Sequence, residues 1–227
     1  MFQPFSSLHL ITVAIGFGLI VILFYLSRRG ENYHNFIRKF LMVWCFCAIP
    51  LSILAWSLWD GPKRLDNFLP LHLCDIATLT AGFALLTRRP LLCAMTYFWG
   101  LAATTQALLT PAITVGFPQL PFIAFFIQHF AIVAVALYLP LMDGWRPRRP
   151  VARAMAEIFG WSVAYHASAL GINFLLGTNY GFASRPPDNP SLIDHLGPWP
   201  WYLLWMQVIA LLLFYLLALP WSERRQK

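Results

Sequence analysis

The chain has 227 residues, of which 59% are hydrophobic and only 11% are charged. This composition excludes a disordered chain and an ordinary soluble domain, and it is typical of a membrane protein with several transmembrane helices. The formal net charge of +7 is explained by basic loops that face anionic lipid. We therefore expect membrane lipids as partners and no nucleic acid, and the oligomeric state stays open.

Seven apolar segments reach or approach the roughly 20 residues that a transmembrane helix needs. They cover about residues 8–27, 36–57, 70–87, 91–110, 120–142, 152–176 and 199–220. Because these segments take up most of the chain, we predict an all-α fold, a single membrane-embedded seven-helix bundle over residues 1–227. The first segment has no basic residue before it and ends in SRRG, so we expect a retained helix and not a cleaved signal peptide.

Basic residues alternate between the two sides of the predicted bundle. Thirteen of the sixteen follow segments 1, 3, 5 and 7, namely Arg28, Arg29, Arg38, Lys39, Arg88, Arg89, Arg146, Arg148, Arg149, Arg153, Arg224, Arg225 and Lys227. The opposite side holds Lys63, Arg64 and Arg185. The positive-inside rule then predicts an external N-terminus and a cytoplasmic C-terminus.

The third segment, 70–87, begins with PLHLCDIA, which places three reactive side chains at a helix start. His72 and Asp75 are three positions apart and share a helix face. The positive end of the helix dipole, with an imidazolium nearby, favours the thiolate form of Cys74. Asp75 has an alternative role as a first-turn acid that simply stabilises the helix start.

The other three cysteines fall in apolar helix sequence, where a reduced cysteine acts as a small hydrophobic residue. Cys45 and Cys47 form a C-x-C pattern. On a helix, however, these two residues point about 200° apart, so they are not expected to share a metal ion. Cys93 is expected to serve in packing, which leaves Cys74 as the candidate nucleophile.

The remaining candidate polar residues follow in chain order, and all are predicted between the outer surface and mid-membrane. Gln106 lies in segment 91–110, and Gln128 and His129 lie in segment 120–142, roughly 12 Å deep. Segment 152–176 contributes His166 and Asn173, and the long loop 178–198 contributes Asn179, Tyr180 and Asp194. The inner half has almost no polar residues apart from its basic rim. This asymmetry predicts a cavity that opens outward, because a channel would place polar residues through the full depth.

His129 has two interpretations. A single membrane histidine often forms a structural hydrogen bond between helices. Beside a thiol on a neighbouring helix, the same side chain would act as a general base.

Several motifs resemble those of a known family. PLHLC (70–74), YFWG (97–100), QALLTP (106–111), the Phe125 to His129 stretch, TNYGF and NPSLIDHLGPWPWY (189–202) are similar to the YwaF-type bacterial integral membrane proteins. More distantly, the chain resembles the eukaryotic transmembrane protein 164 group. The match runs over about 130 residues from the third segment to the seventh, and segments 1 and 2 carry no recognised motif.

The resemblance implies a phospholipid acyltransferase, or a related lipid hydrolase, in a bacterial cytoplasmic membrane. By position it implies Cys74 as nucleophile and His129 as its partner, without a cofactor. Supporting or substrate-binding roles are expected for His72, Asp75, Gln106, Gln128, His166, Asn173, Asn179, Tyr180 and Asp194.

Two other classes stay open. His72, Asp75, His129 and His166 could form a zinc site of a membrane hydrolase, although no H-x-x-x-H pair supports it. A transporter or a receptor for a small molecule or lipid would also suit seven helices with an outward cavity.

Overall fold

A computed structural model describes residues 2–222, and this range is helical without β-strands. Its seven α-helices are α1 (Ser7–Ser27), α2 (Glu31–Leu58), α3 (Leu73–Thr87), α4 (Pro90–Leu109), α5 (Leu120–Leu141), α6 (Val151–Leu176) and α7 (Trp201–Ala218). Four short 3-10 helices join them: η1 (Leu65–Asn67), η2 (Tyr180–Phe182), η3 (Leu192–His195) and η4 (Leu219–Trp221). The all-α prediction is confirmed, and each apolar segment forms a helix.

Helix starts differ most from the predicted boundaries. The second helix begins at Glu31 and not near 36, because its first turn is polar and solvent-facing and so lies outside the apolar pattern. The third begins at Leu73 and not at Pro70, with His72 as the residue before its first turn. Helix α2 passes through Pro50 and continues to Leu58, so this proline does not end the helix.

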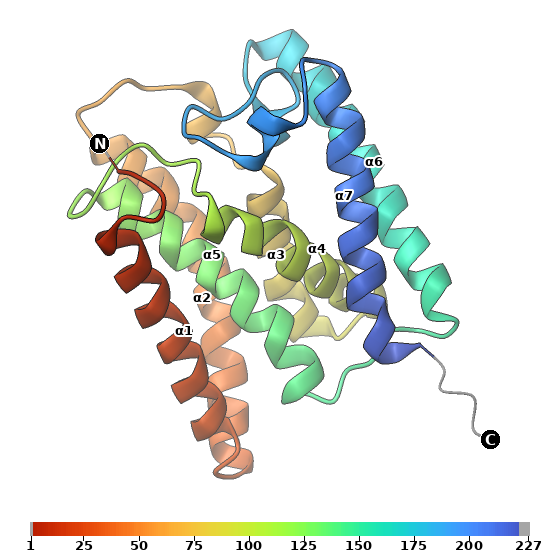
Figure 1. Cartoon of the computed structure of the whole chain (residues 1–227). Coiled ribbons are helices and arrows are strands. Elements are labelled where there is room, and N and C mark those ends of the chain that lie inside the picture. The colour runs from red at the N-terminus through yellow and green to blue at the C-terminus, as the bar shows by residue number, and fades with distance from the viewer. Residues whose placement is uncertain (1, 223–227) are drawn as a thin grey trace.

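The helices run up and down between two ends of the bundle (Figure 1). We call the end formed by residues 59–72, 110–119 and 177–200 the loop end; the N-terminus lies on the same side. The opposite end, formed by residues 28–30, 88–89 and 142–150, carries the arginine-rich turns and is called the basic end. Arg224, Arg225 and Lys227, which are predicted to lie on the same side, fall outside the described residues.

Four helices of the described chain are long and apolar enough to cross a membrane. These are Ser7–Ser27, Glu31–Leu58, Leu120–Leu141 and the combined stretch Trp201–Trp221. Helix α3 is apolar but has only 15 residues, about 22 Å at 1.5 Å per residue. The structure and composition together therefore describe a helical membrane protein.

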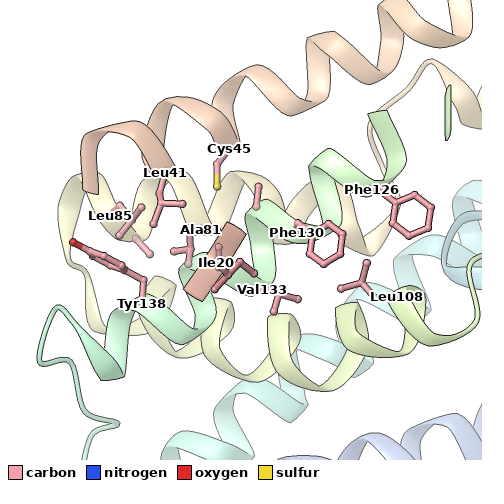
Figure 2. Packing of buried hydrophobic residues seen from close by; sticks show 14 of the residues in the cluster. Ile20, Leu41, Cys45, Ala81, Leu85, Leu108, Phe126, Phe130, Val133 and Tyr138 are labelled. Atoms are coloured by element: carbon pink, nitrogen blue, oxygen red, sulfur yellow. The ribbon is translucent and has the colours of Figure 1, made fainter. Parts of the chain in front are cut away.

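Helix α5 lies at the centre, between α2, α3 and α4. Ile20, Leu41, Ala81, Phe130 and Val133 from four helices meet in one buried cluster (Figure 2). A second cluster joins α4 to α6 and α7 through residues such as Phe98, Ile158 and Phe214. The bundle thus consists of a tightly packed α1–α5 unit and an α6–α7 hairpin that rests mainly on α4.

Gly100 sets how closely α4 and α5 approach. A Cβ atom at this position would lie 2.7 Å from Cβ of Ala136 and 3.2 Å from Cγ2 of Ile132. Such distances are too short for a methyl group in a close-packed interior. The glycine therefore allows the close contact between α4 and α5.

The basic end contains a polar network that the sequence analysis did not anticipate. Ser27 Oγ lies 3.2 Å from the Tyr138 hydroxyl, and Tyr138 lies 3.0 Å from Nδ1 of His34. His34 Nε2 is 3.3 Å from a carboxylate oxygen of the buried Asp143, which also pairs with Arg88. The sequence analysis did not group these side chains, because they are widely spaced in sequence and meet only in the fold.

Candidate functional site

A cavity of about 390 Å³ lies toward the loop end, where the α1–α5 unit meets the α6–α7 hairpin. Its walls come from the second half of α2, the start of α3, the loop-end halves of α4 and α5, and the middle of α6 and α7. Most of the lining is apolar, with a few convergent polar groups. This is the usual composition of a site for a small molecule or a lipid chain.

Seven of the eleven predicted site residues line this cavity. They are His72, Cys74, Asp75, Gln106, Gln128, His129 and His166. They come from four helices, α3 with the residue before it, α4, α5 and α6, so only the tertiary fold brings them together. The structure places Cys74 and His129 on the walls of the same cavity.

The start of α3 places Cys74 in the first helical turn. Asp75 accepts a hydrogen bond from the backbone N–H of His72 at 3.0 Å, and its own N–H donates to the His72 carbonyl at 2.9 Å. The carboxylate therefore performs the helix-start role that was its alternative interpretation. It fixes the backbone turn from which the Cys74 side chain enters the cavity.

Gln128 connects this turn to α5. Its Nε2 donates to Oδ1 of Asp75 at 2.8 Å and approaches Oγ1 of Thr78 at 3.2 Å. Thr78 in turn donates to the Cys74 carbonyl at 2.6 Å. A buried chain of hydrogen bonds thus links the residue before His129 to the turn that carries Cys74.

His129 is oriented by its own helix. Nδ1 lies 2.7 Å from the Phe125 carbonyl, and the ring stacks on the Phe125 ring with centroids 3.9 Å apart. A carbonyl can only accept, so Nδ1 carries the proton and Nε2 keeps its lone pair. Nε2 is the atom that a general base would use.

His72 faces a different neighbour from the one predicted. Its ring packs edge-on against the ring of Tyr180, with centroids 5.0 Å apart. Asp75 uses its two oxygens on the backbone of His72 and on Gln128. The imidazole therefore contributes to the cavity wall next to η2, and the carboxylate is occupied elsewhere.

The four cysteines differ in their surroundings. Cys45 and Cys93 are buried in helix packing, and Cys47 is exposed on the outer face of α2. Cys74 is half-buried and is the cysteine among the described residues that lines the cavity. The role of Cys74 as nucleophile stays a prediction.

Four predicted site residues lie outside the cavity lining: Asn173, Asn179, Tyr180 and Asp194. Asn173 Oδ1 accepts from Tyr180 N–H at 2.7 Å and its Nδ2 donates to the Tyr180 carbonyl at 3.0 Å. Asn179 accepts from the N–H groups of Ser184 and Arg185, and Asp194 accepts from Ser191 N–H. In the structure these polar groups organise the long loop, in which the side chain of Tyr180 is fully buried.

The long loop covers part of the cavity. Pro187, Ser191, Ile193 and Leu196 reach its lining. Asn189 is buried, and its Nδ2 donates to the carbonyls of Pro111 and Ile113 in the α4–α5 loop. Two loops far apart in sequence are therefore fastened to each other above the site.

Several cavity residues were missed by the sequence analysis. Gln207 on α7 is the clearest, since a glutamine inside the apolar run MQVIALLL is a strong signal in its own right. Tyr165 lines the cavity and donates to the Leu71 carbonyl at 3.1 Å. Trp99 donates to Ser162 at 2.8 Å and fastens α4 to α6.

The residues proposed for a zinc site do not assemble into one. Within residues 2–222, no group of three or more His, Cys, Asp or Glu side chains is placed so that it could hold a metal ion. Asp75 is engaged in the α3 cap, and His166 lies on α6, the helix that follows the α5 of His129. The donor set of the metal-hydrolase alternative is therefore dispersed.

Comparisons with known proteins give one family. The model of the TMEM164 family matches residues 4–218, which includes α1 and α2, where no motif was recognised. An uncharacterised protein of Treponema pallidum (strain Nichols) is 28% identical over 193 residues, covering 82% of this chain and 77% of that protein. No solved structure matches.

Proposed function

The chain belongs to the TMEM164 family. From this membership and from the cavity that both Cys74 and His129 line, we propose that it is a cysteine-dependent phospholipid acyltransferase. Cys74 would be the nucleophile and His129 the general base. The observation that carries the proposal is that both line one largely apolar cavity, with Nδ1 of His129 held by Phe125 so that Nε2 can accept a proton.

We also propose the finer placement of the protein. Within the family it would be of the YwaF type, in a bacterial cytoplasmic membrane. All seven helices would span the membrane, with the N-terminus and the loop end outside and the basic end in the cytoplasm. The arginine-rich turns at the basic end support this orientation.

In the first half of the reaction, Nε2 of His129 takes the proton from the Cys74 thiol as sulfur attacks the ester carbonyl of a phospholipid. The carbon–oxygen bond to the glycerol then breaks. The leaving oxygen takes the proton from His129, which gives a lysolipid and an acyl thioester on Cys74.

In the second half, the hydroxyl of an acceptor lipid gives its proton to His129 and attacks the thioester carbonyl. The carbon–sulfur bond breaks and the thiol regains a proton. Negative charge develops on the carbonyl oxygen in both halves, and the first-turn N–H groups of α3 are suited to stabilise it. Gln106 on the cavity wall is a second candidate donor.

The direct test measures acyl exchange between a phospholipid and a lysophospholipid with purified protein in lipid nanodiscs. We expect Cys74→Ser to remove the activity and His129→Ala to lower the rate by about 10²–10⁴-fold, as for loss of a general base. Cys93→Ser is the matched control, because this buried cysteine lies outside the cavity. Exchange at the normal rate in both site variants would overturn the proposal.

A transporter or lipid receptor is the second candidate, because the apolar cavity would also hold a lipid without reacting with it. Intact-mass measurement after incubation with phospholipid separates the two. An added acyl mass that depends on Cys74 supports the enzyme; tight lipid binding with no added mass supports the receptor or transporter.

A further inference from the structure

We infer that His166 and Gln207 form a subsite that binds the hydroxyl group of a lipid in the cavity. The inference deepens the proposed function, because it assigns the place of the acyl acceptor. It concerns the wall formed by the α6–α7 hairpin, which carries neither Cys74 nor His129.

The two side chains contact each other across the hairpin. Nε2 of Gln207 lies 3.1 Å from Nδ1 of His166, and both residues line the cavity. The same Nδ1 lies 3.1 Å from the Ser162 carbonyl one turn earlier on α6. Nδ1 of His166 therefore has two polar neighbours. It donates a hydrogen bond if it carries the ring proton and accepts one if it does not.

Gln207 keeps an acceptor without a protein partner. Its Oε1 is buried and has no hydrogen-bond partner among the residues that the structure describes. Buried polar atoms in folded proteins are almost always paired, so an unpaired one in a cavity wall points to a ligand that pairs with it. Its position inside an apolar helix strengthens this reading.

The His166 ring can carry its proton on either nitrogen, and both arrangements leave one hydrogen-bond donor and one acceptor for a ligand. With Nδ1 unprotonated, it accepts from the Gln207 amide, so the ring N–H at Nε2 and the Gln207 oxygen are left as donor and acceptor. With Nδ1 of His166 protonated, it donates to the Ser162 carbonyl, and the Gln207 amide is turned over so that its oxygen faces Nδ1. Nε2 of the His166 ring is then the acceptor and the amide NH₂ group the donor. One donor and one acceptor are available in each case.

A hydroxyl group is the simplest ligand that is donor and acceptor through a single oxygen. A carboxylate or phosphate oxygen only accepts, and an ammonium group only donates. Most of the cavity lining is apolar, and α7 contributes Met206, Ile209 and Leu213 to it. The expected ligand is therefore a lipid with a free hydroxyl, such as the glycerol hydroxyl of a lysophospholipid.

Other polar groups on this wall are already occupied. Ser162 donates to the Ile158 carbonyl and accepts from Trp99, and Tyr165 donates to the Leu71 carbonyl. These bonds hold the wall in place. Within the described chain, His166 and Gln207 are thus the pair on α6 and α7 with bonding capacity left for the cavity.

The test of binding uses the Cys74→Ser protein, in which no acyl transfer can occur. The probes are 1-O-alkyl lysophosphatidylcholine, which has a free hydroxyl at glycerol position 2, and its 2-deoxy counterpart. We expect the hydroxyl ligand to bind about tenfold more tightly, the worth of one to two hydrogen bonds. Gln207→Met in the same background, which keeps the side-chain length, should bring the two affinities together.

The control is Val208→Ala, since this neighbour on α7 is exposed on the outer face. It should keep the tenfold preference. Thermal unfolding of each variant shows that it is folded. An equal preference with and without Gln207, or no preference in the parent protein, would overturn the inference.

The test of turnover uses the unmodified Cys74. Gln207→Met should raise the KM for lysophospholipid about tenfold, and should shift acyl groups from transfer toward hydrolysis by water. If no acyl thioester forms on Cys74 but the hydroxyl preference in binding depends on Gln207, the enzyme proposal fails and the subsite stands. Normal acyl transfer with an unchanged KM in Gln207→Met overturns the subsite alone.

Discussion

Gln128 on α5 donates a hydrogen bond of 2.8 Å to Asp75 in the first turn of α3, and both residues lie in the cavity wall. This bond joins the turn that carries Cys74 to the helix that carries His129. It therefore fixes the relative position of the two proposed reacting groups. The position of a nucleophile relative to its base decides the rate, since a shift of about 1 Å can cost roughly 10²-fold.

Removing this bond should affect both stability and activity. Gln128→Leu leaves one carboxylate oxygen of Asp75 buried without its side-chain donor, which costs about 1.5–3 kcal/mol. We expect a lower unfolding temperature and at least a tenfold slower acyl exchange. For stability, Gln106→Leu is the control, because Gln106 lines the same cavity without a side-chain hydrogen bond in the described chain. Equal destabilisation by both changes would contradict this role of Gln128.

Asn173 is predicted to stabilise the long loop and not to bind substrate. It makes two hydrogen bonds with the backbone of Tyr180 and accepts a third from Thr178 Oγ1. Asn173→Ala should therefore lower the free energy of unfolding by about 2–3 kcal/mol and speed proteolysis within residues 178–198. Ser168→Ala on the exposed face of the same helix should change neither measurement. Unaltered proteolysis in Asn173→Ala would show that the loop is held by other contacts.

Asn189 should control access to the cavity from the loop end. Loss of its two donated bonds to Pro111 and Ile113 separates the long loop from the α4–α5 loop. We expect Asn189→Ala to increase the rate at which a water-soluble maleimide modifies Cys74, measured by intact mass in a Cys45, Cys47 and Cys93 serine background. The neighbouring Asp188→Ala removes only an exposed 3.5 Å pair with Arg64, which is worth about 0–1 kcal/mol. If maleimide modifies Cys74 at the same rate in both variants, access to the cavity does not depend on the hydrogen bonds of Asn189.

Gly100 should not tolerate a side chain. Gly100→Ala places a methyl group against Ala136 and Ile132, and overpacking of this kind costs about 1–3 kcal/mol. Gly171→Ala on α6 meets nothing within 4 Å and should be neutral or stabilising by up to about 1 kcal/mol. Thermal unfolding in detergent measures both. A Gly100→Ala protein as stable as the parent would mean that α4 and α5 separate at little cost.

The helices were predictable because a hydrophobic run is local in sequence. Each of the seven segments is a helix, and the errors lie at ends such as Glu31, where polar first turns hide the start. The grouping of Cys74, His129 and His166 around one cavity follows from depth, since residues at the same level of neighbouring helices meet. The choice of helix neighbours is not local, and so the hydrogen bonds of Asn173 and the His34 network were not foreseen. Gln207 was visible in the sequence and was overlooked.

The division of the bundle into an α1–α5 unit and an α6–α7 hairpin has a consequence for how such proteins diverge. The proposed nucleophile and base belong to the first part, and the proposed hydroxyl subsite belongs to the second. The hairpin rests on α4 through separate anchors, among them Trp99 to Ser162 and Tyr97 to the Leu217 carbonyl. Substitutions on the inner face of the hairpin can therefore alter which lipid is accepted while the reacting groups stay in place. A family built on this plan can acquire new acceptors without rebuilding its chemistry.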